Sequence, residues 1–253
     1  MRNCLILGSG RSGTSMLAGT LAKAGYFMGD NLYPARESNP KGFFEDPVVN
    51  GINEEILEPL NFKLTHPIGR WFEDYQLTYG QRWLERVPIR SRIPTPASVV
   101  DTIKKVTEQV PFCFKDPRFS YTLPVWRPYL KNTVFLCIFR EPAATAASII
   151  KECKDIDYLQ GVNINFDIAL EVWTLMYRHI VEKHRHEGEW LFIHYKQVLN
   201  GEILDNLELF TGAAVDRAFP ERSLQRSSVD RVIPTATKRI YKKLCELADF
   251  REI

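Results

Sequence analysis

The sequence predicts an α/β fold with three layers, α/β/α, in which a central parallel sheet carries a P-loop-like phosphate-binding loop. Short apolar runs at 2–7, 112–114, 133–139 and 190–195 alternate with stretches of helical periodicity. The run at 133–139 is apolar throughout, as expected for a central parallel strand that is covered on both faces. Strands that alternate with helices are typical of this fold class.

The helices are predicted from the spacing of apolar residues. The stretch 14–25 has this spacing and ends at Gly25, so that a strand, a glycine loop and a helix follow one another. Comparable spacing predicts further helices at 48–60, 142–153, 166–187 and 201–211.

The segment 27–100 differs from the rest of the chain. It is rich in proline, glycine, asparagine and aromatic residues, and its periodicity is weak outside the expected helix. No linker marks its ends, so we interpret 1–253 as a single domain in which this segment is an insertion over the sheet. The tail 222–253 is rich in basic residues and is interpreted as a solvated helix face, with residues available to close over an anion.

Composition and charge argue against several classes of protein. The chain has 33 basic and 31 acidic residues, a formal net charge of +2, which does not indicate a nucleic-acid partner. No apolar run is long enough for a signal-peptide core or a membrane span. The five cysteines have no C-x-x-C spacing and favour buried thiols in a reducing compartment over a disulfide framework or a zinc site. We therefore expect a cytoplasmic protein.

The stretch 6–17 reads ILGSGRSGTSML and has the G-x-x-x-x-G spacing of a phosphate-binding loop. A nucleotide triphosphatase needs a lysine after the second glycine, but Thr14 stands there and the basic residue is Arg11. The backbone N–H groups of 9–14 and the start of the following helix can cradle one phosphate-like group. The loop therefore suits a nucleotide that does not end in a triphosphate. The predicted binding residues are Gly10, Arg11, Ser12, Gly13, Thr14 and Ser15.

A second phosphate-binding element is predicted at 139–148, which reads FREPAATAAS. Arg140 follows the most apolar strand, a proline opens a helix, and Ser148 lies eight residues further on. The carboxyl ends of parallel strands form the ligand crevice of an α/β sheet. We therefore expect Arg140 and Ser148 to hold a separate phosphate beside the loop, which requires the strands 2–7 and 133–139 to lie side by side or nearly so.

Together these two stretches resemble the sulfotransferases that use 3′-phosphoadenosine 5′-phosphosulfate (PAPS). The runs FKDPR at 114–118 and NPKGFFE at 39–45 resemble two further segments found in bacterial members, so the resemblance covers about 1–200. It implies that the loop binds the 5′-phosphosulfate, that Arg140 and Ser148 bind the 3′-phosphate, and that no metal is needed. Tyr195 alone matches the family's late Y-E-x-L pattern, which implies a place near the adenine.

The resemblance implies transfer of a sulfuryl group from PAPS to a hydroxyl or amine of an acceptor, leaving 3′,5′-adenosine bisphosphate. Lys115 and Arg11 are the candidates for stabilising the leaving phosphate. Glu45 is the candidate base, because Phe43 and Phe44 are expected to desolvate its carboxyl and raise its pKa. The reserve candidates for the base are Glu37 and His66. Asp116 is expected to orient Lys115 or to cap a helix.

Other residues are interpreted less specifically. His179, His184 and His186 are expected on the surface and His194 packed in a strand. The aromatic residues of the insertion are expected in the core or along an acceptor site, where they would favour a hydroxylated aromatic, lipid-like or sugar acceptor. They are Trp71, Phe72, Tyr75, Tyr79 and Trp83. A nucleotide or nucleoside kinase and a non-catalytic protein that binds PAPS or another nucleotide remain the alternative functions.

Overall fold

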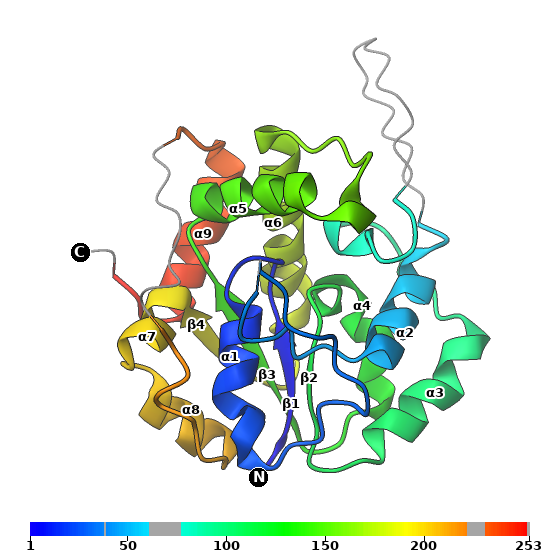
Figure 1. The fold of residues 1–253 in the computed structure, drawn as a ribbon, viewed down its shortest axis with the longest axis vertical. Coiled ribbons are helices and arrows are strands. Elements are labelled where there is room, and N and C mark those ends of the chain that lie inside the picture. Colours follow the sequence, from blue (N-terminus) through cyan, green and yellow to red (C-terminus); the bar gives the residue numbers. More distant parts are fainter. Residues whose placement is uncertain (38, 61–76, 222–230, 252–253) are drawn as a thin grey trace.

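The computed structural model describes residues 1–37, 39–60, 77–221 and 231–251. In this part of the chain the strands form one parallel sheet of four, in the order β2-β1-β3-β4 (Figure 1). The strands are β1 (Asn3–Leu7), β2 (Cys113–Lys115), β3 (Thr133–Phe139) and β4 (Glu189–His194). The predicted α/β fold with a parallel sheet is confirmed.

Strand β3 pairs with β1 on one side and with β4 on the other. Leu5 lies opposite Phe135 and Leu7 opposite Cys137, so the strands at 2–7 and 133–139 are neighbours, as predicted. Because β1 and β3 run parallel, their carboxyl ends lie at the same end of the sheet. The loop after β1 and Arg140 after β3 therefore leave the sheet at that end.

Alternate side chains of the strands enter two separate hydrophobic cores. Val134, Leu136 and Ile138 of β3 pack with α1 (Thr14–Leu21), α7 (Tyr195–Asn200) and α8 (Leu204–Thr211) on one face. The intervening Phe135, Cys137 and Phe139 belong to the core of the other face. This period of two places apolar residues on both sides of β3, which explains why its sequence is apolar throughout.

The second face is covered by more helices than the first. These helices are α2 (Pro47–Leu57), α3 (Ala97–Thr107), α4 (Phe119–Trp126), α6 (Phe166–His179) and α9 (Thr235–Leu247). Helix α5 (Pro142–Asp155) packs against α6 (Figure 1). The described residues also form short helical turns at Ala22–Ala24, Arg82–Leu84, Arg127–Tyr129 and Asp157–Leu159, and a π-helix at Ile180–His184.

Three helices were not expected from the periodicity. Helix α4 contains Pro124, which counts against a helix in a sequence, although α4 continues across it for two residues. Helix α3 buries only Val99 and Ile103, which is too narrow a stripe to be recognised. The strand expected at 190–195 ends at His194, whose ring nitrogen accepts the N–H of Lys196 and so begins α7.

Helix α9 lies in the basic tail. Thr237, Ile240 and Leu244 are buried against the core, and Lys238 and Lys242 are exposed, so the predicted solvated helix face is present at 235–247. The basic residues of 222–230 lie outside the described residues. No helix in the described ranges is both long and apolar enough to cross a membrane.

The expectation that His179 and His184 lie on the surface is wrong. Their ring nitrogens form hydrogen bonds with the carbonyl oxygens of Val87 and Ser120, because the end of α6 and the π-helix pack against α4 and the preceding loop. Burial lowers the pKa of His179 to about 4 and that of His184 to about 3. His194 is buried and stacks on Phe250 with 3.7 Å between ring centroids, as expected for a packed histidine.

Candidate active site

The loop between β1 and α1 is held close to its neighbours. The Tyr177 hydroxyl accepts the N–H of Ser9 at 3.1 Å and donates to the carbonyl of Ile138 at 2.7 Å, which fixes the loop to β3. Gly13 has a φ of 98°, and a Cβ there would lie 2.6 Å from the Tyr195 ring. A larger residue would therefore move the loop away from the start of α7, so glycine is required at this position.

The end of this loop is suited to an anion. At the start of α1, the N–H of Leu17 donates to the carbonyl of Gly13 at 3.1 Å and so begins the helical hydrogen bonding. The N–H groups of Thr14 and Ser15 precede it and have no helical carbonyl to bind. Both residues line the cavities described below and lie at the positive end of the helix dipole, where a phosphate or phosphosulfate oxygen is a favourable partner. This geometry is compatible with the predicted backbone cradle for a phosphate-like group.

Arg11 joins the loop to α5. Its backbone has a φ of 67°, its Nε donates to Ser148 Oγ at 3.2 Å, and its guanidinium lies 3.3 Å from the Glu152 carboxylate. The Ser148 hydroxyl thus contacts Arg11 as well as lying in the cavity that Arg140 lines. Ser12, by contrast, is fully buried beneath the loop and lines neither cavity described below.

Arg140 occupies the position expected after β3. Its guanidinium lies over the Tyr195 ring, 4.9 Å from the centroid, and its Nε is 3.7 Å from a Glu141 carboxylate oxygen. It lines a cavity of about 580 Å³ between the loop and α5, which we call the α5 cavity. Further lining residues that the sequence predicted are Arg11, Gly13, Thr14, Ser15, Ser148 and Tyr195. The structure therefore brings the two predicted phosphate elements to one cavity.

A second cavity of about 310 Å³ lies on the other side of the loop, beside α2, and we call it the α2 cavity. Lys115, Glu45 and Asn50 line it, and so do Tyr79 and Trp83 of the segment 27–100. Both cavities are lined by Arg11, Asn39, Thr14, Ser15 and Glu152, so they adjoin at the loop.

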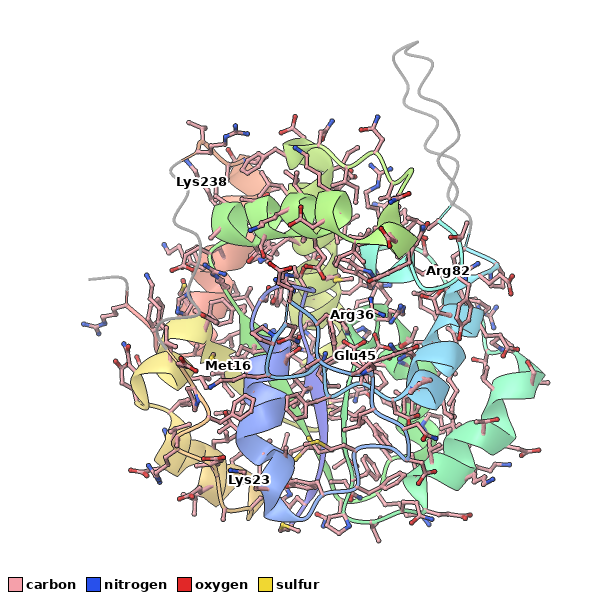
Figure 2. The ribbon with its side chains drawn as sticks, in the orientation of Figure 1. Met16, Lys23, Arg36, Glu45, Arg82 and Lys238 are labelled. Atoms are coloured by element: carbon pink, nitrogen blue, oxygen red, sulfur yellow. The ribbon has the colours of Figure 1, made fainter. Side chains whose placement is uncertain are left out.

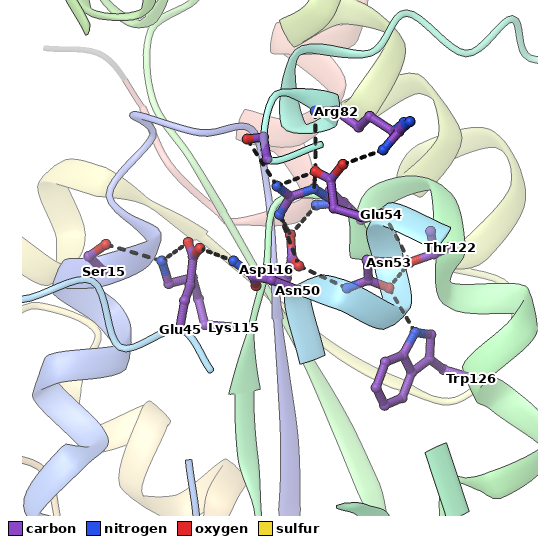
Figure 3. Close-up of polar contacts among 12 residues, drawn as sticks. Ser15, Glu45, Asn50, Asn53, Glu54, Arg82, Lys115, Asp116, Thr122 and Trp126 are labelled. Carbon is purple, nitrogen blue, oxygen red and sulfur yellow. Dashed lines mark hydrogen bonds and ion pairs between the residues drawn. The ribbon is translucent and has the colours of Figure 1, made fainter. Parts of the chain in front are cut away.

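Lys115 and Glu45 meet in the α2 cavity beside Ser15, which lines both cavities, and we call this place the junction (Figure 3). The Lys115 ammonium forms an ion pair with Glu45 Oε1 and donates to Ser15 Oγ at 3.3 Å. Asn50 donates from its amide to Glu45 Oε2 at 2.8 Å. Lys115 is buried, with 3% of its surface exposed, because it extends from the end of β2 beneath the start of α1. Lys115 therefore does not lie on the surface, where lysine residues are usually found.

The expectation that Glu45 has a raised pKa is wrong. Burial favours the neutral acid, but the charges of Lys115 and Arg118 outweigh burial and hold the pKa of Glu45 below its usual value. Phe44, which was expected to desolvate the carboxyl, instead makes an edge contact with Phe219 at 5.6 Å. The neighbours that matter for Glu45 are therefore cations from other parts of the chain.

A buried polar network supports this side of the site (Figure 3). Arg118 donates to Glu54 Oε1 at 2.7 Å and to Asp116 Oδ1 at 3.0 Å, and Arg82 donates to Glu54 Oε2 at 2.8 Å. The amide of Asn53 donates to Asp116 Oδ2 at 2.9 Å. Burial, opposed by Arg118, raises the pKa of Asp116 to about 6. Asp116 therefore holds Arg118 and the turn before α4, and in the described part of the chain its carboxylate bonds to Arg118 and Asn53 rather than to Lys115.

The sequence contains a signal for this network in the polar residues of α2. Asn50, Asn53 and Glu54 recur at helical spacing on α2, on the face that is buried. Polar residues on the buried face of a helix require partners, and here they bind Glu45, Asp116, Arg82 and Arg118.

The reserve candidates for the base are not at the junction. Glu37 is exposed and lines the α5 cavity, away from Lys115. His66 lies outside the described residues, and so do Trp71, Phe72 and Tyr75.

The fold can be compared with known structures. The sulfotransferase domain from the Synechococcus PCC 7002 olefin synthase matches with a TM-score of 0.57 and 15% identity, over 96% of this chain and 94% of that one. The sulfotransferase domain from the curacin biosynthetic pathway matches with a TM-score of 0.53 and 13% identity, over 100% and 99%. No protein-family model and no curated protein matches by sequence. The chain has the fold of these sulfotransferase domains, in agreement with the expected resemblance.

Proposed function

We propose that the protein is a sulfotransferase that transfers a sulfuryl group from PAPS to a hydroxyl or amine of an acceptor. The observation that carries the proposal is the shared wall of the two cavities. Two anion-binding elements, from the ends of β1 and β3, line the α5 cavity, and a lysine and a carboxylate stand where it adjoins the α2 cavity. A donor with two separate phosphates and a distinct acceptor need two adjoining binding regions, which the two cavities can provide.

The α5 cavity supports the donor side. The N–H groups at the start of α1 and the Arg11 guanidinium suit the phosphosulfate, and Arg140 with Ser148 suits the 3′-phosphate. The Tyr195 ring lies against Arg140 and offers an apolar surface for the adenine. Thr14 in place of a lysine fits a donor that has no γ-phosphate to neutralise.

The junction supports the chemical step. The acceptor oxygen forms a bond to sulfur while the bond from sulfur to the bridging oxygen breaks, and the acceptor proton passes to Glu45. Lys115 stabilises the negative charge that appears on the departing phosphate. As Lys115 turns to that phosphate, Glu45 loses its nearest cation and its pKa rises, which makes it a stronger base.

Transfer of labelled sulfate from PAPS tests the proposal directly. Phenols, sugars and hydroxylated lipids are screened as acceptors, with ATP and magnesium in a parallel set. PAPS-dependent labelling of an acceptor is the expected result. Magnesium-dependent transfer from ATP would favour a kinase. Tight binding of 3′,5′-adenosine bisphosphate without transfer to any acceptor would favour a non-catalytic nucleotide-binding protein.

A further inference from the structure

The α2 cavity contains an arginine whose charge is not matched by a carboxylate. Within the described ranges, Arg36 forms no ion pair, whereas each other cation that lines this cavity does. Those pairs are Arg11 with Glu152, Lys115 with Glu45, and Arg118 with Glu54 and Asp116. The positive charge of Arg36 is therefore the one that remains available to a ligand in the cavity.

Aromatic rings hold the Arg36 guanidinium. The ring centroids of Phe43 and Tyr158 lie 6.0 and 5.9 Å from its central carbon, and both residues line the α2 cavity. The amide of Gln81 donates to the Tyr158 carbonyl at 2.7 Å and so fixes that residue. Contact with ring faces stabilises the cation but leaves its N–H donors unused. A planar fork of N–H groups matches a carboxylate.

The rest of the cavity wall suits an apolar body. Tyr33, Tyr79 and Trp83 add to the aromatic lining. A cavity of about 310 Å³ with aromatic walls and a few polar groups is typical of a site for a small organic ligand. Arg36 and Glu45, both labelled in Figure 2, line this same cavity. An acceptor here can present a hydroxyl to Glu45 and another group to Arg36.

We propose that the acceptor is a hydroxyl compound with an aromatic or other apolar body that carries a carboxylate, and that Arg36 binds this carboxylate. The inference rests on the proposed function, because it assigns the α2 cavity to the acceptor. A second anion is tolerated in this cavity because Arg36 neutralises it, and the charge of Arg118 still acts on Glu45 when Lys115 turns to the phosphate. Arg36 thereby selects acceptors by charge, independently of the reacting hydroxyl.

A matched pair of probes tests the assignment. One probe is 3-(4-hydroxyphenyl)propionate and the other is its neutral primary amide. Binding of each is measured by calorimetry with 3′,5′-adenosine bisphosphate present, and KM is measured with PAPS. The carboxylate should bind more tightly by up to about 5-fold, because Arg36 is exposed and an exposed ion pair is worth up to about 1 kcal/mol.

Three variants complete the test. Arg36→Gln should remove most of the preference for the carboxylate, and Arg36→Lys should retain part of it because the charge remains without the planar fork. Arg90→Gln is the matched control, since Arg90 is exposed and lines neither cavity. It should retain the full preference. Unchanged affinity of Arg36→Gln for 3′,5′-adenosine bisphosphate verifies that this variant is folded.

The outcomes separate this inference from the proposed function. If the bisphosphate binds but the two probes bind equally, or neither binds, the carboxylate assignment is overturned and the donor site stands. If Arg36→Gln keeps the preference for the carboxylate, the assignment to Arg36 is overturned. Failure of the wild-type protein to bind the bisphosphate would overturn the proposed function, and the acceptor role of the cavity with it.

Discussion

Lys115 and Glu45 form an ion pair at the point where the two cavities adjoin, with Ser15 as the second partner of the lysine. The residues come from different segments, the end of β2 and the loop before α2, so the fold is needed to bring them together. The pair lowers the pKa of Glu45 and so keeps the carboxylate ionised. In the proposed function, donor binding separates the pair and prepares both groups for the reaction.

The first prediction concerns the donor site. We expect 3′,5′-adenosine bisphosphate to raise the melting temperature, because the proposed partners of its two phosphates both line the α5 cavity. At about 100 times its Kd, a ligand stabilises the folded state by roughly 2.7 kcal/mol. ATP with magnesium should have a much smaller effect, since Thr14 replaces the lysine that a γ-phosphate needs. Thermal unfolding measures both shifts, and an equal or larger shift with ATP would contradict the donor assignment.

The second prediction separates the two phosphate sites. Arg140→Ala should weaken binding of 3′,5′-adenosine bisphosphate by about 1.5–3 kcal/mol, the value of a hydrogen bond to a charged group. Adenosine 5′-phosphosulfate lacks the 3′-phosphate and serves as the control ligand, whose affinity should change little. Calorimetry gives both values. Equal weakening of the two nucleotides would mean that Arg140 does not contact the 3′-phosphate.

Much of the lining of the α5 cavity could be predicted from the sequence because its parts are local. A loop between a strand and a helix, and an arginine after an apolar strand, are each recognisable within about ten residues, and a parallel sheet brings their ends together. The contact of Arg11 with Ser148 could not be predicted, because it depends on how α5 lies over the loop. The network at Arg118 joins residues 64 positions apart, and its only local signal is the polar spacing on α2.

The third prediction tests that network. Glu54→Gln should lower the free energy of unfolding by about 3–5 kcal/mol, because Arg82 and Arg118 would remain buried with one carboxylate fewer. Glu55→Gln is the matched control on the same helix. Glu55 is exposed, so its replacement should change the free energy of unfolding by no more than about 0.5 kcal/mol. Urea unfolding measures both variants, and similar effects would show that the network adds little to stability.

The fourth prediction concerns pH and the buried His184. Its pKa is about 3 in the folded protein, below the usual value near 6.5 of an unfolded chain, so unfolding takes up a proton between these values. Stability therefore falls as pH is lowered through this window, by up to about 1.4 kcal/mol per pH unit for this residue. His184→Gln cannot take up that proton and should be less sensitive to pH.

The comparison is made by urea unfolding at several pH values between 4 and 7. Stability of the wild type relative to His184→Gln should decrease as pH falls. His186→Gln is the control, because His186 is exposed, and its stability should follow that of the wild type at each pH. A constant difference between the wild type and His184→Gln would show that His184 is not held neutral by burial.

The fifth prediction assigns the roles at the junction. Glu45→Gln should leave the affinity for 3′,5′-adenosine bisphosphate within a few fold, because a base acts on the acceptor. It should lower kcat by about 10²–10⁴, the usual contribution of a general base. Lys115→Ala should lower kcat and also weaken donor binding, since the lysine is expected to contact the phosphate. Steady-state kinetics with PAPS and an acceptor from the screen, together with calorimetry, separate the two effects.

Glu37→Gln and His66→Ala are the comparison variants for the base. Glu37 lines the α5 cavity rather than the junction, so its replacement should leave kcat nearly unchanged. Normal kcat in Glu45→Gln, with loss of activity in Glu37→Gln or His66→Ala, would place the base elsewhere. The donor assignment would survive that result, because it rests on the loop, Arg140 and Ser148. A loss of donor affinity in Glu45→Gln as large as in Lys115→Ala would instead mean that the ion pair mainly positions the lysine.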